Sequence, residues 1–152
     1  MLELLSLGLA LLVGTTTPVQ ASTTPITIEV HRGNNAEALE YAIQYFKDEP
    51  EMLKISYCES SWRMWDDSGK KPRVLSGIVQ PQDRGFMMVN EHFHKEEALA
   101  LGYDIENFYG NIGYGKYLYE HNGTKDWNAS KGCWGKMTDG ELKVLIDGIL
   151  NK

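Results

Sequence analysis

The residues of this chain best suited to chemistry are two acids, Glu59 and Asp83, which have unlike sequence surroundings. Glu59 follows the apolar stretch 52–57, so we expect it near the end of a helix, where burial raises the pKa of a carboxyl group. Asp83 opens a strand-like run that contains a glycine. Cleavage of a glycosidic bond uses such a pair, because one carboxyl group donates a proton to the leaving oxygen and the other stays charged beside the developing oxocarbenium ion. For Asp83, a turn residue that caps Arg84 and Gly85 is an equal alternative.

Four short blocks of the sequence resemble the lysozyme-like superfamily, in particular the soluble lytic transglycosylases. Glu59-Ser60-Ser61, after an apolar helical stretch, is similar to the Glu-Ser signature of that family. Residues 83–90 resemble its Gly-Leu-Met-Gln-Ile-Asn block, and residues 111–119 resemble its Asn-Ile-x-x-Gly-x-x-Tyr-Leu block. Residues 127–134 look like the ending of small secreted members. The blocks follow one another in the family's order and run from about residue 36 to residue 134.

The resemblance implies a mainly α-helical (α+β) domain with a lysozyme-like fold, a small β-hairpin and a cleft. It also implies cleavage of the β-1,4 bond between N-acetylmuramic acid and N-acetylglucosamine in peptidoglycan. Glu59 would protonate the glycosidic oxygen and then take a proton from the C6 hydroxyl of the sugar, so that the ring closes without water. We favour this transglycosylase outcome. The alternative is a hydrolase in which Asp83 acts as the second acid.

The same resemblance and the abundance of aromatic residues indicate where sugars would bind. The candidate substrate-binding residues are Ser60, Ser61, Met88, Asn90, Tyr114, Tyr117 and Trp127. Ser60 and Ser61 could equally end the helix. Met88 stands where the family has a glutamine, and this departure keeps open a third alternative, a catalytically inactive glycan-binding module.

Many of the aromatic residues must also serve the core, because large aromatic side chains dominate the core of a small protein. We expect half or more of the following set to be buried: Trp62, Trp65, Tyr114, Tyr117, Tyr119, Trp127 and Trp134. His92 and His94 alternate without a third ligand at a fixed spacing, which is a weak signal for a metal. We therefore expect neither a metal nor a cofactor.

The length, the net charge and the N-terminal residues limit the class of protein to which this chain can belong. The chain has 152 residues and a net charge of −6, which argues for one domain and against a nucleic-acid partner. The apolar run 4–13 is too short to span a bilayer, and with Val19-Gln20-Ala21 it predicts a signal peptide over 1–21. Glu3 stands where a basic residue is expected, which leaves an uncleaved anchor as an alternative. We expect a linker over 22–33 and the lysozyme-like domain over 34–152. We also expect the protein to be exported and monomeric, and to bind the glycan strands of peptidoglycan.

Two cysteines, Cys58 and Cys133, fit an oxidising compartment and one disulfide bond. Two unrelated buried thiols would be the better interpretation for a cytosolic chain. The bond would close a loop of about 75 residues and stabilise the fold by roughly 4 kcal/mol. It would also hold the turn that carries Glu59 against the C-terminal segment.

Apolar periodicity and capping residues predict the elements that must position these side chains. We expect helices over about 35–47, 50–60, 95–101 and 111–120, and a last helix that begins with a capping box at Thr138 and Glu141. Residues 66–76 are typical of an exposed loop or hairpin tip, and residues 77–90 of a small hairpin or cleft wall. Gly113 and Gly115 interrupt a helical stretch, which indicates close packing of another backbone there.

Overall fold

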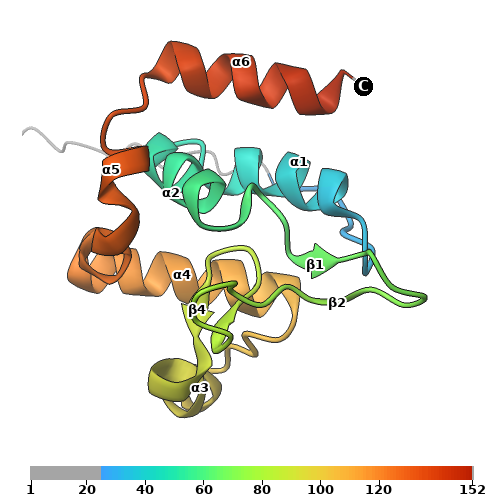
Figure 1. Ribbon diagram of the computed structural model, residues 1–152, viewed down its shortest axis with the longest axis vertical. Coiled ribbons are helices and arrows are strands. Elements are labelled where there is room, and N and C mark those ends of the chain that lie inside the picture. Colours follow the sequence, from blue (N-terminus) through green and yellow to red (C-terminus); the bar gives the residue numbers. More distant parts are fainter. Residues whose placement is uncertain (1–24, 152) are drawn as a thin grey trace, which may run out of the picture.

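The computed structural model describes residues 25–151, and this part of the chain is mainly helical with two small antiparallel hairpins. The predicted mainly α class is therefore confirmed (Figure 1). The predicted signal peptide lies outside the described residues, and residues 25–33 contain neither helix nor strand. Within residues 25–151, none of the helices has the length and apolar character needed to cross a membrane.

The first two helices begin and end close to where local signals place them. Helix α1 spans Asn35–Tyr45, and the side chain of Asn34 caps it by accepting a hydrogen bond from the backbone N–H of Glu37. Helix α2 spans Pro50–Ser60, the predicted range, with proline in its first turn, where a missing N–H costs no helical hydrogen bond. The end of α2 therefore carries Glu59.

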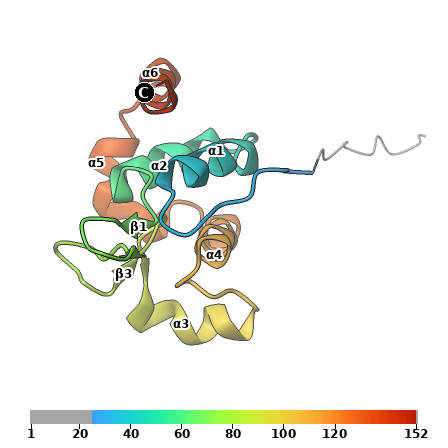
Figure 2. The ribbon, with the colours of Figure 1, turned by 90° about the vertical axis from the view of Figure 1, so that its right-hand side faces the viewer.

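Two small antiparallel hairpins follow α2, each a separate two-stranded sheet. Strand β1 (Trp65–Asp66) pairs with β2 (Arg73–Val74), and β3 (Asp83–Arg84) pairs with β4 (Val89–Asn90). A further bridge between Ser76 and Arg84 connects the two pairs. Both predicted hairpin regions are thus confirmed. In Figure 2 the hairpins lie to one side, with α1 and α2 above them and α3 below.

Helices α3 and α4 each begin several residues earlier than predicted, because their capping residues lie further upstream. Helix α3 spans Glu91–Ala100, and the side chain of Asn90 accepts hydrogen bonds from two backbone N–H groups of its first turn. Helix α4 spans Phe108–Asn122, and the side chain of Asn107 accepts from the N–H of Gly110. An asparagine in either cap satisfies helix donors that would otherwise lack partners.

The C-terminal part contains two short elements that were not predicted and one that was. The 3-10 helix η1 (Lys125–Ser130) and the short helix α5 (Lys131–Trp134) pack against α2 and each other. Helix α6 spans Asp139–Leu150 and begins with the predicted capping box of Thr138 and Glu141. It lies alongside α1 and α2 (Figure 1). The predicted disulfide bond joins Cys58 in α2 to Cys133 in α5.

The core lies between α1, α2, the hairpins and α4, and aromatic residues fill much of it. All four tryptophans and Tyr114 are buried, whereas Tyr117 and Tyr119 are half-buried, which confirms the expectation for this set. The reason predicted for the glycines of α4 was wrong. A Cβ at Gly113 or Gly115 would meet the side chain of Tyr103 or Met87, at 2.9 and 2.6 Å respectively, and the close backbone approach occurs at Gly110 instead.

Candidate active site

Two adjoining cavities form a groove across the end of α2 and the β3–β4 hairpin. Their volumes are about 390 and 350 Å³, and both are lined by Glu59, Gln80, Asp83 and Met88. One cavity extends toward α3 and η1, and the other toward the loop 75–80. The two predicted acids therefore share one groove and lie where its two parts meet.

Glu59 is half-buried at the end of α2, and burial is the main reason why its pKa is raised above the ordinary value of 4.5. The negative charge of Asp83 raises this pKa further. A hydrogen bond acts in the opposite direction, because Ser130 Oγ donates to Glu59 Oε1 at 2.5 Å and favours the charged form. The balance leaves a carboxyl group that keeps its proton to a higher pH than an exposed glutamate.

Asp83 lies on β3 opposite Asn90 on β4, and the two side chains bind each other across the hairpin. Asn90 Nδ2 donates to Asp83 Oδ1 at 2.7 Å. Asn90 also caps α3, so its amide links the second acid to the start of that helix. Both side chains line the groove, and the bond fixes the rotamer of Asp83 within it.

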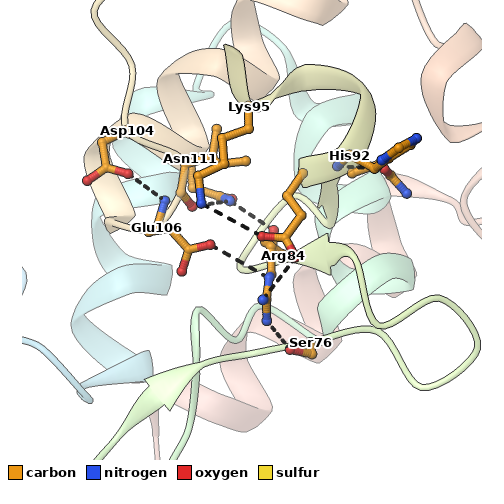
Figure 3. Close-up of polar contacts among 10 residues, drawn as sticks. Ser76, Arg84, His92, Lys95, Asp104, Glu106 and Asn111 are labelled. Carbon is orange, nitrogen blue, oxygen red and sulfur yellow. Dashed lines mark hydrogen bonds and ion pairs between the residues drawn. The ribbon is translucent and has the colours of Figure 1, made fainter. Parts of the chain in front are cut away.

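Arg84, the neighbour of Asp83, is directed away from the groove, because successive residues of a strand face opposite sides of a sheet. Its guanidinium group donates to the hydroxyl of Ser76 and, at 3.0 Å, to Glu91 Oε1, and its Nε lies 3.7 Å from Glu106 Oε1 (Figure 3). Among residues 25–151 no basic side chain forms an ion pair with either groove acid. Lys125 and Arg63 line the two parts of the groove, but neither pairs directly with Glu59 or Asp83.

Asn111 of α4 binds the turn of the β3–β4 hairpin through hydrogen bonds to its backbone. Its buried side chain accepts a hydrogen bond from Met87 N at 2.9 Å and donates to Ile105 O at 3.0 Å. It also donates to Arg84 O at 2.8 Å (Figure 3). The sequence block that begins at Asn111 thus has a structural role here. It fixes the groove wall that carries Asp83.

Ser60 and Trp127, two of the predicted substrate-binding residues, also fasten this turn. Ser60 is buried, and its hydroxyl donates to Phe86 O at 2.8 Å. Trp127 is buried in η1, lines the groove, and donates from Nε1 to Met87 O at 3.0 Å. Three helical elements therefore hold the turn in place, which gives Asp83 a defined position relative to Glu59.

The remaining predicted residues divide between the groove and the core. Ser61, exposed and in a left-handed conformation at the end of α2, lines the groove together with Met88, and Asn90 lines the part near α3. Tyr114 and Tyr117 line neither part. Tyr114 is fully buried, and the half-buried ring of Tyr117 stacks on it with 5.6 Å between ring centroids.

Tyr114 instead connects His94 to an acid. Its hydroxyl donates to Glu97 Oε2 at 2.7 Å, and burial and Glu97 together raise the pKa of this tyrosine, so the phenol keeps its proton. The same oxygen lies 3.2 Å from His94 Nδ1, which must therefore be the donor. His94 lines the groove, and the residues 25–151 contain no group of side chains suited to hold a metal ion.

Ser130, Gln80, Phe93 and His94 line or contact the site but were not among the predicted site residues. The predicted disulfide bond could have indicated that Ser130 lies near Glu59. A bond between Cys58 and Cys133 brings the neighbour of one, Glu59, close to residues three positions before the other.

A further cavity of about 650 Å³ lies elsewhere, between α5 and α6. Met137, Val144 and Leu145 are among its lining residues, and it contains none of the candidate catalytic residues. The groove brings together two acids, one of them with a raised pKa, and polar groups that could bind a sugar. Comparisons with protein families, with curated proteins and with solved structures found no match to this chain.

Proposed function

We propose that this chain is a glycosidic-bond-cleaving enzyme with a lysozyme-like fold that acts on the β-1,4 bond between N-acetylmuramic acid and N-acetylglucosamine. The observation that carries the proposal is that Glu59 is half-buried and lines the groove. Burial raises the pKa of its carboxyl group above the ordinary value. A carboxyl group of this kind is a proton donor that still functions when exposed acids are ionised.

In the proposed mechanism Glu59 gives its proton to the glycosidic oxygen as the bond from C1 to that oxygen breaks. Positive charge develops on the sugar ring, and the carboxylate of Asp83 lies in the same groove, where it lowers the energy of that charge. Glu59, now ionised, takes a proton from the hydroxyl group that attacks C1. In a lytic transglycosylase this is the C6 hydroxyl of the same sugar, so no water is consumed.

The fold assignment rests on how the groove is built. A buried helix, α2, ends at the acid, a small hairpin forms the facing wall, and α4 packs behind that hairpin through Asn111. This order of elements agrees with the order of the four sequence blocks that resemble the family. The disulfide bond is compatible with an exported protein, and peptidoglycan glycan strands are the proposed partner.

A hydrolase is the second candidate, and the position of Asp83 favours it. Asp83 lines both parts of the groove, and its charge raises the pKa of Glu59, so the two carboxyl groups are close enough to interact. A retaining hydrolase needs its second acid about 5 Å from the first. In this alternative, water takes the place of the C6 hydroxyl.

Digestion of purified peptidoglycan followed by mass spectrometry tests the proposal. A transglycosylase releases fragments lighter by one water than those of a hydrolase, which have ordinary reducing ends. The Glu59→Gln variant is the matched control and should release neither. If the wild-type protein binds peptidoglycan and releases no fragment, the chain is a glycan-binding module and the proposed enzyme activity is wrong.

A further inference from the structure

Ser130, at the end of η1, has two acceptors within reach of one hydroxyl proton. Its half-buried Oγ lies 2.5 Å from Glu59 Oε1 and 3.1 Å from the backbone oxygen of Trp127. A serine hydroxyl donates one hydrogen bond, so it can serve only one of these acceptors at a time. The choice of acceptor determines which carboxyl oxygen of Glu59 can carry the proton.

When Glu59 is ionised, its carboxylate is the stronger acceptor. Hydrogen bonds from a hydroxyl group to a charged oxygen are short, about 2.5–2.7 Å, and roughly twice as strong as neutral ones. The 2.5 Å distance between Ser130 Oγ and Glu59 Oε1 lies in that range. Ser130 therefore donates to Oε1 in this state and stabilises the charge that burial opposes.

When Glu59 is protonated, its proton can reside on either carboxyl oxygen. If the proton were on Oε1, Ser130 would have to release that oxygen and donate to the longer contact with Trp127. If the proton is on Oε2, Ser130 keeps its short bond to Oε1. Among residues 25–151 Oε2 has no hydrogen-bond partner, so it is the oxygen available to a ligand in the groove.

We propose that Ser130 is a positioning residue that binds Glu59 Oε1 in both protonation states and thereby reserves Oε2 for the exchanged proton. The inference rests on the proposed function. In the first step one proton moves from Oε2 to the glycosidic oxygen, which also takes the electron pair of the breaking C1–O bond. In the second step Oε2 takes one proton from the attacking hydroxyl as its oxygen bonds to C1. Ser130 neither gains nor loses a proton.

The position of Ser130 depends on the C-terminal segment rather than on α2. The segment η1 packs against α2 and α4, and the disulfide bond at Cys133, three residues further on, ties this segment to Cys58 beside Glu59. The hydroxyl and the acid are thus held together by a covalent link between their neighbours. This makes the contact a fixed feature of the groove.

A titration of the Glu59 carboxyl carbon by ¹³C NMR tests the inference without any substrate. Ser130→Ala removes a bond that favours the charged form, so we expect the midpoint of Glu59 to rise by about one pH unit. Ser130→Thr keeps the hydroxyl and should titrate like the wild type. Ser68→Ala, which removes a hydroxyl at the exposed hairpin tip, is the control and should leave the midpoint of Glu59 unchanged.

Two results of this titration would overturn the inference. One is an unchanged or lower midpoint in Ser130→Ala while the amide spectrum remains that of the folded protein. The other is a rise in Ser130→Thr as large as in Ser130→Ala, because the hydroxyl group would then not be the cause.

Turnover of peptidoglycan supplies an independent readout. In Ser130→Ala we expect kcat to fall about tenfold with KM nearly unchanged, and the alkaline limb of the pH profile to move to higher pH. Ser130→Thr should restore both values. A raised KM with unchanged kcat would make Ser130 a substrate contact and contradict the inference. If the wild-type protein shows no turnover, the proposed function fails, while the titration still decides the role of Ser130.

Discussion

At the scale of single residues, the proton of Glu59 is governed by three effects of unequal size. Burial is the largest and raises its pKa, the hydrogen bond from Ser130 lowers it, and the charge of Asp83 raises it. A carboxyl group with a raised pKa stabilises the folded state most below its ordinary value of 4.5, and this contribution is lost as the pH rises through the raised value. The site therefore costs stability at neutral pH, as is common where function requires a buried ionisable group.

Glu59→Gln removes the exchanged proton and also the cost of a buried charge. We expect turnover to fall by roughly 10²- to 10⁴-fold, because general acid catalysis contributes about that much. The thermal midpoint should rise above that of the wild type at pH 7 and match it at pH 4, where the wild-type glutamate is protonated. Calorimetry at both pH values checks this, and an equal difference at both would contradict the raised pKa.

Asp83→Asn keeps the acceptor oxygen for Asn90 and removes one negative charge from the groove. Because this charge raises the pKa of Glu59, we expect the alkaline limb of the pH profile to move to lower pH in the variant. A hydrolase that uses Asp83 should also lose nearly all turnover, whereas a transglycosylase should retain much of it. A pH profile identical to that of the wild type would show that Asp83 has no electrostatic effect on Glu59.

At the scale of elements, the β3–β4 hairpin is too short to be stable alone, since each strand has two residues. Gly85 in its turn has φ +70°, and a Cβ there would lie 2.6 Å from the sulfur of Met64. The turn is held by side chains of α2, α4 and η1. The groove wall is consequently a product of tertiary hydrogen bonds more than of strand pairing.

Asn111→Ala tests this dependence on α4. The substitution leaves the N–H of Met87 and the carbonyl groups of Arg84 and Ile105 without partners in a buried region, so we expect a loss of about 2–4 kcal/mol in the free energy of unfolding. Urea denaturation measures it. The exposed Asn122→Ala is the control and should cost less than about 0.5 kcal/mol. Similar losses in both variants would show that the turn does not need Asn111.

At the scale of the whole molecule, the disulfide bond links the helix that carries the acid to the segment that carries Ser130 and Trp127. The two cysteines are 75 positions apart, and the loop between them contains both hairpins, α3 and α4. Cross-linking so long a loop restricts the unfolded chain more than the folded one. The bond thus contributes to stability and to the geometry of the groove together.

The double variant Cys58→Ala/Cys133→Ala should lose about 4 kcal/mol of unfolding free energy on the chain-entropy model. Turnover should fall as well under conditions where the variant is still folded, because Ser130 is then less firmly held against Glu59. Denaturant unfolding and peptidoglycan digestion at low temperature measure the two effects. Full turnover in the folded double variant would show that the disulfide bond is not needed for the geometry of the groove.

The sequence by itself determined the features that depend on a few neighbouring residues. Proline and apolar spacing placed α2 at its observed bounds, Thr138 and Glu141 placed the start of α6, and the cysteine count predicted the disulfide bond. Caps and periodicity act over one or two turns of chain, which is why they can be recognised locally.

Only the tertiary structure decided which side chains meet. Ser130 and Glu59 are 71 positions apart, and no local pattern encodes their 2.5 Å contact. Tyr114, expected in the cleft, instead lies in the core because its helix presents that face to Glu97 and His94. Contacts of this kind depend on how whole helices pack, and packing is set by the combined burial of many side chains rather than by any one segment.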